Sequence, residues 1–75
     1  MSKRQSLPFH YRLGVFRRDE YTCRNCGFSG PANTLEVDHI IPVVLNGGDE
    51  PENLQTLCRT CNRRKGAKLE VPIAS

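Results

Sequence analysis

The 75-residue sequence predicts a small α+β fold in which one helix precedes a two-stranded hairpin and a second helix follows it. In residues 8–18, Phe9, Leu13 and Phe16 recur at the spacing of one helical face, and Pro8 suits a first helical turn. Residues 35–41 alternate in polarity and contain β-branched side chains, which favours a strand. A second short strand is expected over residues 54–57, and a second helix from about residue 59 to Gly66.

The connection between the two predicted strands is rich in turn-forming residues. The stretch NGGD at 46–49 has the composition of a turn, and PEN at 51–53 continues it. Pro42 lacks an N–H group and cannot donate to a sheet. We therefore expect regular strand pairing to end or to bulge between residues 38 and 40.

The size and composition of the chain limit how it can be stabilised. A chain this short forms a single domain, residues 1–75, and its ends at 1–7 and 70–75 are expected to be flexible. Only 37% of the residues are hydrophobic and none is tryptophan, so the core is thin and needs a covalent or metal staple. The N-terminus MSKRQS has no apolar segment typical of secretion, and no membrane-spanning stretch is visible, which favours a reducing cytoplasm.

The four cysteines form two C-x2-C pairs, Cys23 with Cys26 and Cys58 with Cys61. Two such turns can point four thiolates at one Zn²⁺ ion, with each sulfur about 2.3 Å from the metal, and Gly27 gives the first turn backbone freedom. Iron in the same cage or a pair of disulfides are the alternatives. Structural zinc contributes roughly 10–16 kcal/mol in small peptides, which is enough to offset a thin core. Because all four ligands come from the protein, this zinc is expected to be structural and not catalytic.

Basic residues are concentrated at the two ends of the chain, with none between Arg24 and Arg59. The formal net charge is only +3, so local clusters and not the total charge indicate a polyanionic partner. The zinc site would bring the two basic ends together. The residues expected to contact DNA phosphates are Arg17, Arg18, Arg24, Arg63, Arg64, Lys65 and Lys68.

Three motifs in order, VDHIIP, ENLQTLC and CRTCNRRKG, resemble the signature of the HNH nuclease family, in its zinc-bearing branch with two C-x2-C pairs. The resemblance covers residues 17–68. It implies a ββα-metal (His-Me finger) fold that hydrolyses phosphodiester bonds in DNA with one divalent cation. His39, Asn53 and Asn62 correspond to the three letters of the family name. The third position is asparagine where many members have histidine, which makes this chain an H-N-N variant.

The resemblance also implies a role for each residue of the site. His39 would be the general base, and Asn53 would hold the loop and orient the His39 ring. Asp38 and Asn62 would hold the catalytic cation, and their hard oxygen atoms favour Mg²⁺ or Mn²⁺ over nickel or zinc. Because neighbouring side chains on a flat strand point to opposite faces, Asp38 and His39 can serve one phosphate only if the strand bends.

The preferred interpretation is therefore a metal-dependent DNA endonuclease of low sequence specificity, acting on double-stranded DNA in a bacterial or phage-infected cell. The chain has no obvious second module for reading sequence, and a partner protein could supply specificity. Both a monomer that nicks and a dimer that cuts both strands agree with the motifs. The alternative from another class is a noncatalytic, zinc-ribbon-like module that binds nucleic acid through its basic ends.

Overall fold

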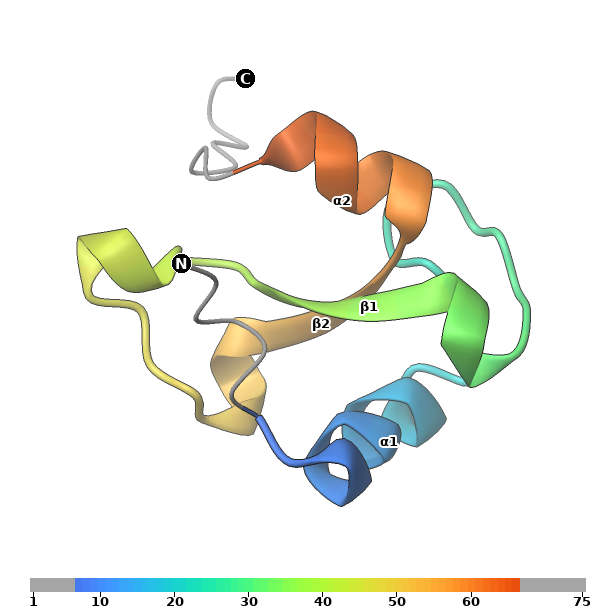
Figure 1. The fold of residues 1–75 in the computed structure, drawn as a ribbon, viewed down its shortest axis with the longest axis horizontal. Coiled ribbons are helices and arrows are strands. Elements are labelled where there is room, and N and C mark those ends of the chain that lie inside the picture. Colours follow the sequence, from blue (N-terminus) through green and yellow to red (C-terminus); the bar gives the residue numbers. More distant parts are fainter. Residues whose placement is uncertain (1–6, 67–75) are drawn as a thin grey trace.

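The computed structural model describes residues 7–66, in which two helices enclose a two-stranded sheet (Figure 1). Helix α1 (Phe9–Arg18) comes first, and the first C-x2-C turn follows it. Strands β1 (Leu35–His39) and β2 (Leu54–Cys58) form the hairpin, and helix α2 (Arg59–Lys65) begins directly after β2. Three short 3₁₀ turns complete the described residues: η2 (Ala32–Thr34) directly precedes β1, η4 (Pro51–Asn53) directly precedes β2, and η3 (Val43–Leu45) lies in the loop between the strands. This architecture confirms the predicted α+β fold of the ββα-metal type.

The two strands pair antiparallel, from Leu35 opposite Cys58 to His39 opposite Leu54. One further backbone bond follows, in which the Ile40 N–H donates to the Asn53 carbonyl over 2.8 Å. Regular pairing therefore ends within the interval expected from Pro42. The chain between the strands forms a long loop; its η3 part extends away from both helices (Figure 1), and its returning arm contacts α1 through Tyr11 and Arg18.

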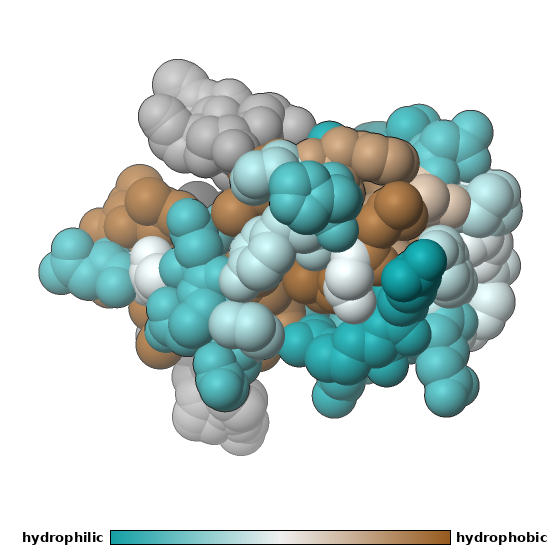
Figure 2. Space-filling view, turned by 90° about the horizontal axis from the view of Figure 1, so that it is seen from below, coloured by the Kyte–Doolittle hydropathy of each residue, from teal (hydrophilic) through white to brown (hydrophobic). Residues whose placement is uncertain are grey.

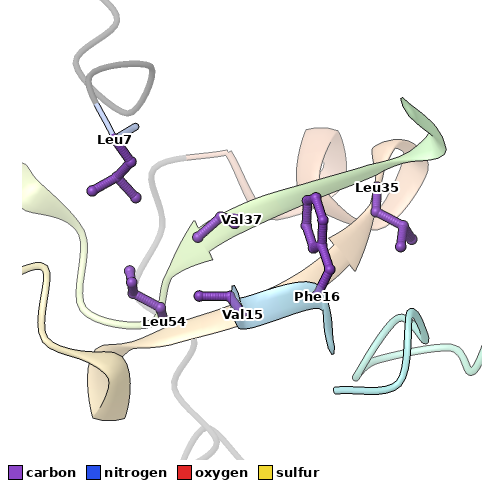
Figure 3. Close-up of a cluster of buried hydrophobic side chains, with 6 residues drawn as sticks. All are labelled: Leu7, Val15, Phe16, Leu35, Val37 and Leu54. Carbon is purple, nitrogen blue, oxygen red and sulfur yellow. The ribbon is translucent and has the colours of Figure 1, made fainter. Parts of the chain in front are cut away.

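The two helices lie on different sides of the sheet, and α1 covers the side that carries the apolar core (Figures 1 and 3). Alternate residues of β1 face this core, as a strand with one buried face requires. The buried cluster consists of Leu7, Val15, Phe16, Leu35, Val37 and Leu54. Of the residues expected to form the helical face, Phe16 is buried, Leu13 is partly buried and Phe9 is 59% exposed. Phe9 is the first residue of α1, and the Arg12 guanidinium lies over its ring, 5.4 Å from the ring centre.

Of the two ends that were expected to be flexible, residues 1–7 and 70–75, the structure describes only Leu7. Leu7 was expected to belong to a flexible end, but its side chain is buried in the core. Residues 1–6 and 67–75, which include Lys68, lie outside the described residues. Neither α1 nor α2 has the length and apolar composition needed to cross a membrane.

A buried carboxylate joins α1 to β2 and to the first cysteine turn. Asp19 follows α1, and its side chain accepts hydrogen bonds from Arg18 at 2.8 and 3.0 Å and from Arg24 at 3.0 Å. It also accepts the backbone N–H of Thr56 in β2 over 3.0 Å. Burial raises the pKa of Asp19, but the bonds from Arg18, Thr56 and Arg24 outweigh burial and lower it to about 2. Asp19 is therefore an ionised structural centre at neutral pH.

Apolar and hydrophilic side chains are interspersed on the face shown in Figure 2. One apolar patch lies at the end that carries the loop after β1, and others lie across the middle and upper right of this face. The exposed apolar residues of this loop are Ile41, Val43, Val44 and Leu45. Ile41 was expected to belong to the first strand, which was predicted over residues 35–41; β1 ends at His39, so Ile41 lies in the loop and is exposed.

Candidate nuclease site

The four cysteines meet in one cluster at the start of α2. Their sulfur atoms all lie within 4.8 Å of one another, and the Sγ atoms of Cys26 and Cys58 are 3.8 Å apart. A tetrahedral zinc site with bonds of about 2.3 Å has sulfur–sulfur edges of about 3.8 Å. Gly27 has a φ of +84°, the conformation for which a glycine is favoured after the first pair. The cluster therefore has the composition and dimensions to hold a structural zinc ion, and no disulfide links these cysteines.

Hydrogen-bond donors reach three of the four sulfurs, and they affect them unequally: the Asn25 side chain lowers the pKa of Cys61, but burial and the neighbouring sulfurs raise it to about 11. Backbone N–H groups of Asn25 and Cys26 donate to Cys23 Sγ at 3.4 Å, and the Cys61 N–H donates to Cys58 Sγ at the same distance. Burial raises the pKa of Cys23, but hydrogen bonds from the backbone of Cys26, Cys58 and Asn25 lower it to about 6. Donors of this kind favour the thiolate form, which is the form that binds metal.

His39 ends β1 with its ring buried, since its side chain is only 6% exposed. Its Nε2 lies 2.7 Å from Oδ1 of Asp49, which comes from the far arm of the loop. An ionised carboxylate can only accept a hydrogen bond, so Nε2 carries the proton and donates it. In the neutral form of the ring, Nδ1 is then the nitrogen with a free lone pair.

Asn53 holds the two arms of this loop together. Its Oδ1 accepts the Ile41 N–H at 2.8 Å, while its Nδ2 donates to the Ile41 carbonyl at 3.1 Å and to the Gly48 carbonyl at 2.8 Å. Gly47 lies so close to the other arm that an added Cβ would be 1.7 Å from the Ile41 oxygen. The expected loop-holding task of Asn53 thus has a physical basis. Its amide bonds to backbone and not to the His39 ring, whose contact is with Asp49.

Asp38 faces away from the α1 side and meets α2. Its carboxylate accepts hydrogen bonds from Lys65 Nζ at 3.3 Å for Oδ1 and from Gln55 Nε2 at 2.9 Å for Oδ2. Lys65 Nζ also lies 3.1 Å from Oδ2 and donates to the His39 carbonyl at 3.0 Å. Both side chains of this ion pair are buried, with 6% of Lys65 and 7% of Asp38 exposed.

Asn62 lies one helical turn before Lys65 and donates from Nδ2 to Oε1 of Glu36. Glu36 and Asp38 are two residues apart on β1, so both point toward α2. Glu36 and Asn62 line a surface hollow together with Arg59, Arg63 and Gly66. Asp38 and Asn62 therefore lie on facing elements but have separate partners. Carboxylate and amide oxygens are the kind of ligand that a hard cation prefers, and Asp38, Glu36 and Asn62 carry them on these two facing elements.

The basic residues expected to bind DNA differ in how far their side chains are exposed. Arg17, Arg63 and Arg64 are exposed, and Arg24 is exposed although it also bonds to Asp19. Arg18 donates to Asp19 and to the carbonyls of Pro51 and Leu54, so most of its guanidinium is used within the fold.

Lys65 differs most from the expectation of an exposed phosphate contact, because it is buried against Asp38. Lys68 lies outside the described residues.

Two side chains of the site are not singled out by the sequence motifs. Asp49 belongs to a stretch that composition identifies only as a turn, and Gln55 is one of the polar residues of a strand. The sequence feature that could have indicated Asp49 is its position directly after two glycines, in the loop that begins after His39. For Gln55, the signal is the antiparallel register, which places it opposite Asp38.

Comparison with known proteins agrees with this arrangement. The model of the family described as HNH endonuclease matches residues 23–68, which contain both cysteine pairs, His39, Asn53 and Asn62. A protein of Lactococcus phage SK1 described as a probable HNH endonuclease is 40% identical over 62 residues, which cover 75% of this chain and 65% of that protein. The type IV methyl-directed restriction enzyme EcoKMcrA of Escherichia coli K12 is 33% identical over 55 residues, 65% of this chain and 20% of the enzyme.

The chain thus spans 65% of the phage protein and a fifth of the E. coli enzyme. The residues matched by the family model contain the whole hairpin and the cysteine cluster. Since the family model covers more than half of the chain, the sequence similarity and the ββα architecture lead to the same assignment. The chain belongs to the HNH endonuclease family.

Proposed function

We propose that the domain is a metal-dependent endonuclease that hydrolyses phosphodiester bonds in DNA with little sequence preference. The observation that carries this proposal is the environment of His39. Its ring ends β1 with one nitrogen engaged by Asp49, whereas the preceding residue, Asp38, faces α2; because pairing stays regular through His39, the two side chains leave the strand on opposite faces, and sharing one phosphate would require the end of β1 to bend. Membership of the HNH family supports the same chemistry.

In the proposed reaction, His39 is the general base. An imidazole titrates near neutral pH and contributes roughly 10²- to 10⁴-fold when it accepts a proton in the transition state. Nδ1 would take a proton from the attacking water, because Nε2 donates to Asp49. The water oxygen forms a bond to phosphorus, the bond from phosphorus to the 3′ oxygen breaks, and solvent protonates the leaving oxygen.

Asp38 and Asn62 are the residues proposed to hold the catalytic cation, Mg²⁺ or Mn²⁺. A cation bound there would neutralise charge on the scissile phosphate and on the departing oxygen. Asp38 now bonds to Lys65 and Gln55, and Asn62 bonds to Glu36, so binding requires both residues to exchange partners. With an amide in place of the family's histidine at position 62, nickel and zinc should support less activity than magnesium or manganese.

Exposed arginines are proposed to position the duplex. Arg63 and Arg64 follow Asn62 on α2, while Arg17 and Arg24 lie near the end of α1 and in the first cysteine turn. Contacts from such residues to phosphates fix the register of DNA but carry little sequence information. A protein partner would then choose the target sequence.

The experiment compares the wild-type protein with His39→Ala on supercoiled plasmid DNA, with zinc in the cysteine cluster and Mg²⁺ or Mn²⁺ added. His10→Ala is the matched control, because His10 is exposed on α1 and far along the chain from the motifs. We expect His39→Ala to cleave at least about 100-fold more slowly, while zinc content and DNA binding in the absence of Mg²⁺ and Mn²⁺ stay unchanged.

Equal cleavage by His39→Ala and wild type would refute the base assignment. If wild-type protein binds DNA but does not cleave it with any of the metals, the noncatalytic zinc-ribbon-like alternative is favoured. Clearly faster cleavage with nickel or zinc than with magnesium or manganese would refute the proposed oxygen-ligand site.

A further inference from the structure

We infer that Asp49 is the residue that positions His39, by accepting the Nε2 proton and thereby directing Nδ1 toward the attacking water. This inference rests on the proposed nuclease function and adds to it a residue outside the three family motifs. Asp49 Oδ1 lies 2.7 Å from Nε2, which is the distance of a strong, charge-assisted hydrogen bond. A buried ring with such a partner is fixed in both orientation and tautomer.

The position of Asp49 is itself defined from two sides. The Tyr11 hydroxyl of α1 donates to the Asp49 backbone carbonyl over 2.6 Å. Asn53 Nδ2 donates to the carbonyl of the preceding residue, Gly48, and the Asn53 N–H donates to the Glu50 carbonyl over 2.8 Å. The backbone on each side of Asp49 is therefore bonded to the fold although its side chain is 60% exposed.

These contacts give Asn53 an indirect route to the His39 ring. Asn53 closes the base of the loop through Ile41 and Gly48, and the closed loop returns Asp49 to the ring. A residue ten positions after His39 can reach it only because the two arms approach as closely as Gly47 allows. Orientation of the ring thus belongs to Asp49, and Asn53 provides the shape of the loop.

The test uses the zinc-loaded full chain, without DNA or magnesium, carrying ¹⁵N-labelled histidine. A ring N–H that donates to a protein acceptor exchanges slowly with water and gives a ¹H–¹⁵N cross-peak, whereas a ring N–H exposed to water does not. His10→Gln leaves His39 as the one remaining histidine and assigns the signal. We expect a His39 Nε2–H cross-peak in wild type, its loss in Asp49→Ala and its retention in Asp49→Asn, because the asparagine oxygen still accepts.

Glu50→Gln is the control, since Glu50 is the neighbouring exposed acid and its carbonyl, not its side chain, bonds to Asn53. This variant should keep both the cross-peak and activity. Asp49→Ala should cleave plasmid DNA on the order of 10-fold more slowly, because a poorly oriented base loses part of its contribution to the rate. Its zinc content and DNA affinity should stay unchanged. Asp49→Asn should retain more activity than Asp49→Ala.

A missing His39 cross-peak in wild type, or one that persists in Asp49→Ala, would overturn the inference. So would unchanged cleavage by Asp49→Ala after its cross-peak is lost. If the cross-peak depends on Asp49 but wild-type protein does not cleave DNA, the proposed function fails while the structural pairing of Asp49 with His39 holds.

Discussion

Replacing Asp19 by asparagine should destabilise the domain, and the expected size follows from its buried contacts. The Asp19 side chain is 1% exposed and accepts bonds from Arg18, Arg24 and the Thr56 N–H. Its pKa is lowered from 3.8 to about 2, because these bonds outweigh the cost of burial. At 1.36 kcal/mol for each pKa unit, the folded state favours the ionised form by roughly 2 kcal/mol. Asp19→Asn should therefore lose about 2 kcal/mol of unfolding free energy, or about 30-fold in the equilibrium constant.

The pH dependence of this loss has a definite sign. Because the folded-state pKa is below the unfolded value, Asp19 stabilises the fold at pH values above about 4 and loses this effect as pH falls toward 2. Protonation of the cysteines would release zinc from the cluster in acid, so the measurement belongs above about pH 5.5. Between about pH 5.5 and 7.5, the difference between wild type and Asp19→Asn should stay constant.

The assay is urea unfolding at a buffered free zinc concentration, followed by circular dichroism, with zinc content measured on each protein. Glu20→Gln serves as the control because Glu20 is the next residue and is exposed. A loss below about 0.5 kcal/mol for Asp19→Asn, within the usual range for surface substitutions, would refute the reasoning. An equal loss in Glu20→Gln would refute it as well.

Two further predictions concern the zinc cluster and the buried ion pair. Cys58→Ser should lose zinc and unfold, since roughly 10–16 kcal/mol of metal binding is also folding free energy. Elemental analysis measures the zinc content and circular dichroism measures folding. A variant that folds without metal would contradict this prediction. Lys65→Met should bind Mn²⁺ roughly 10-fold more tightly without DNA, about 1.4 kcal/mol, because the ammonium no longer competes for Asp38. Electron paramagnetic resonance of free Mn²⁺ reports this affinity, Lys65→Arg is the control, and unchanged or weaker binding would count against it.

The sequence predicted the elements that depend on local chemistry. The C-x2-C spacing predicted the cysteine cluster, and Pro42 predicted the end of pairing near His39. The cluster follows from the geometry of a C-x2-C turn, and the end of pairing follows from the missing N–H of proline. Both causes lie in residues that are close together in the sequence. The contact between Asp49 and His39 could not be read in this way, because it depends on a loop closed by Asn53 and on a close backbone approach at Gly47.

Lys65 is an instructive exception, because its burial could have been inferred. It lies four residues after Cys61 and seven after Cys58, the spacing of one helical face. The cysteine cluster directs that face inward, so the same face carries Lys65 inward. The positive charge of Lys65 predicts an exposed side chain, whereas its helical spacing from the two cysteines predicts a buried one. The structure follows periodicity because Asp38 provides a partner for the charge.

Helix α2 is therefore held at both ends by different interactions, and Asn62 lies between them. Cys58 and Cys61 fix its beginning through the cysteine cluster, while Lys65 fixes its end through Asp38 and the His39 carbonyl. A helix of seven residues has little stability of its own, so these two anchors decide where Asn62 sits relative to β1. A zinc ion with no open coordination position would still control the proposed catalytic site, because it fixes the helix that faces Glu36 and Asp38. The buried ion pair at the other end lies where the catalytic cation is proposed to bind, so any cation that takes Asp38 from Lys65 also loosens the second anchor.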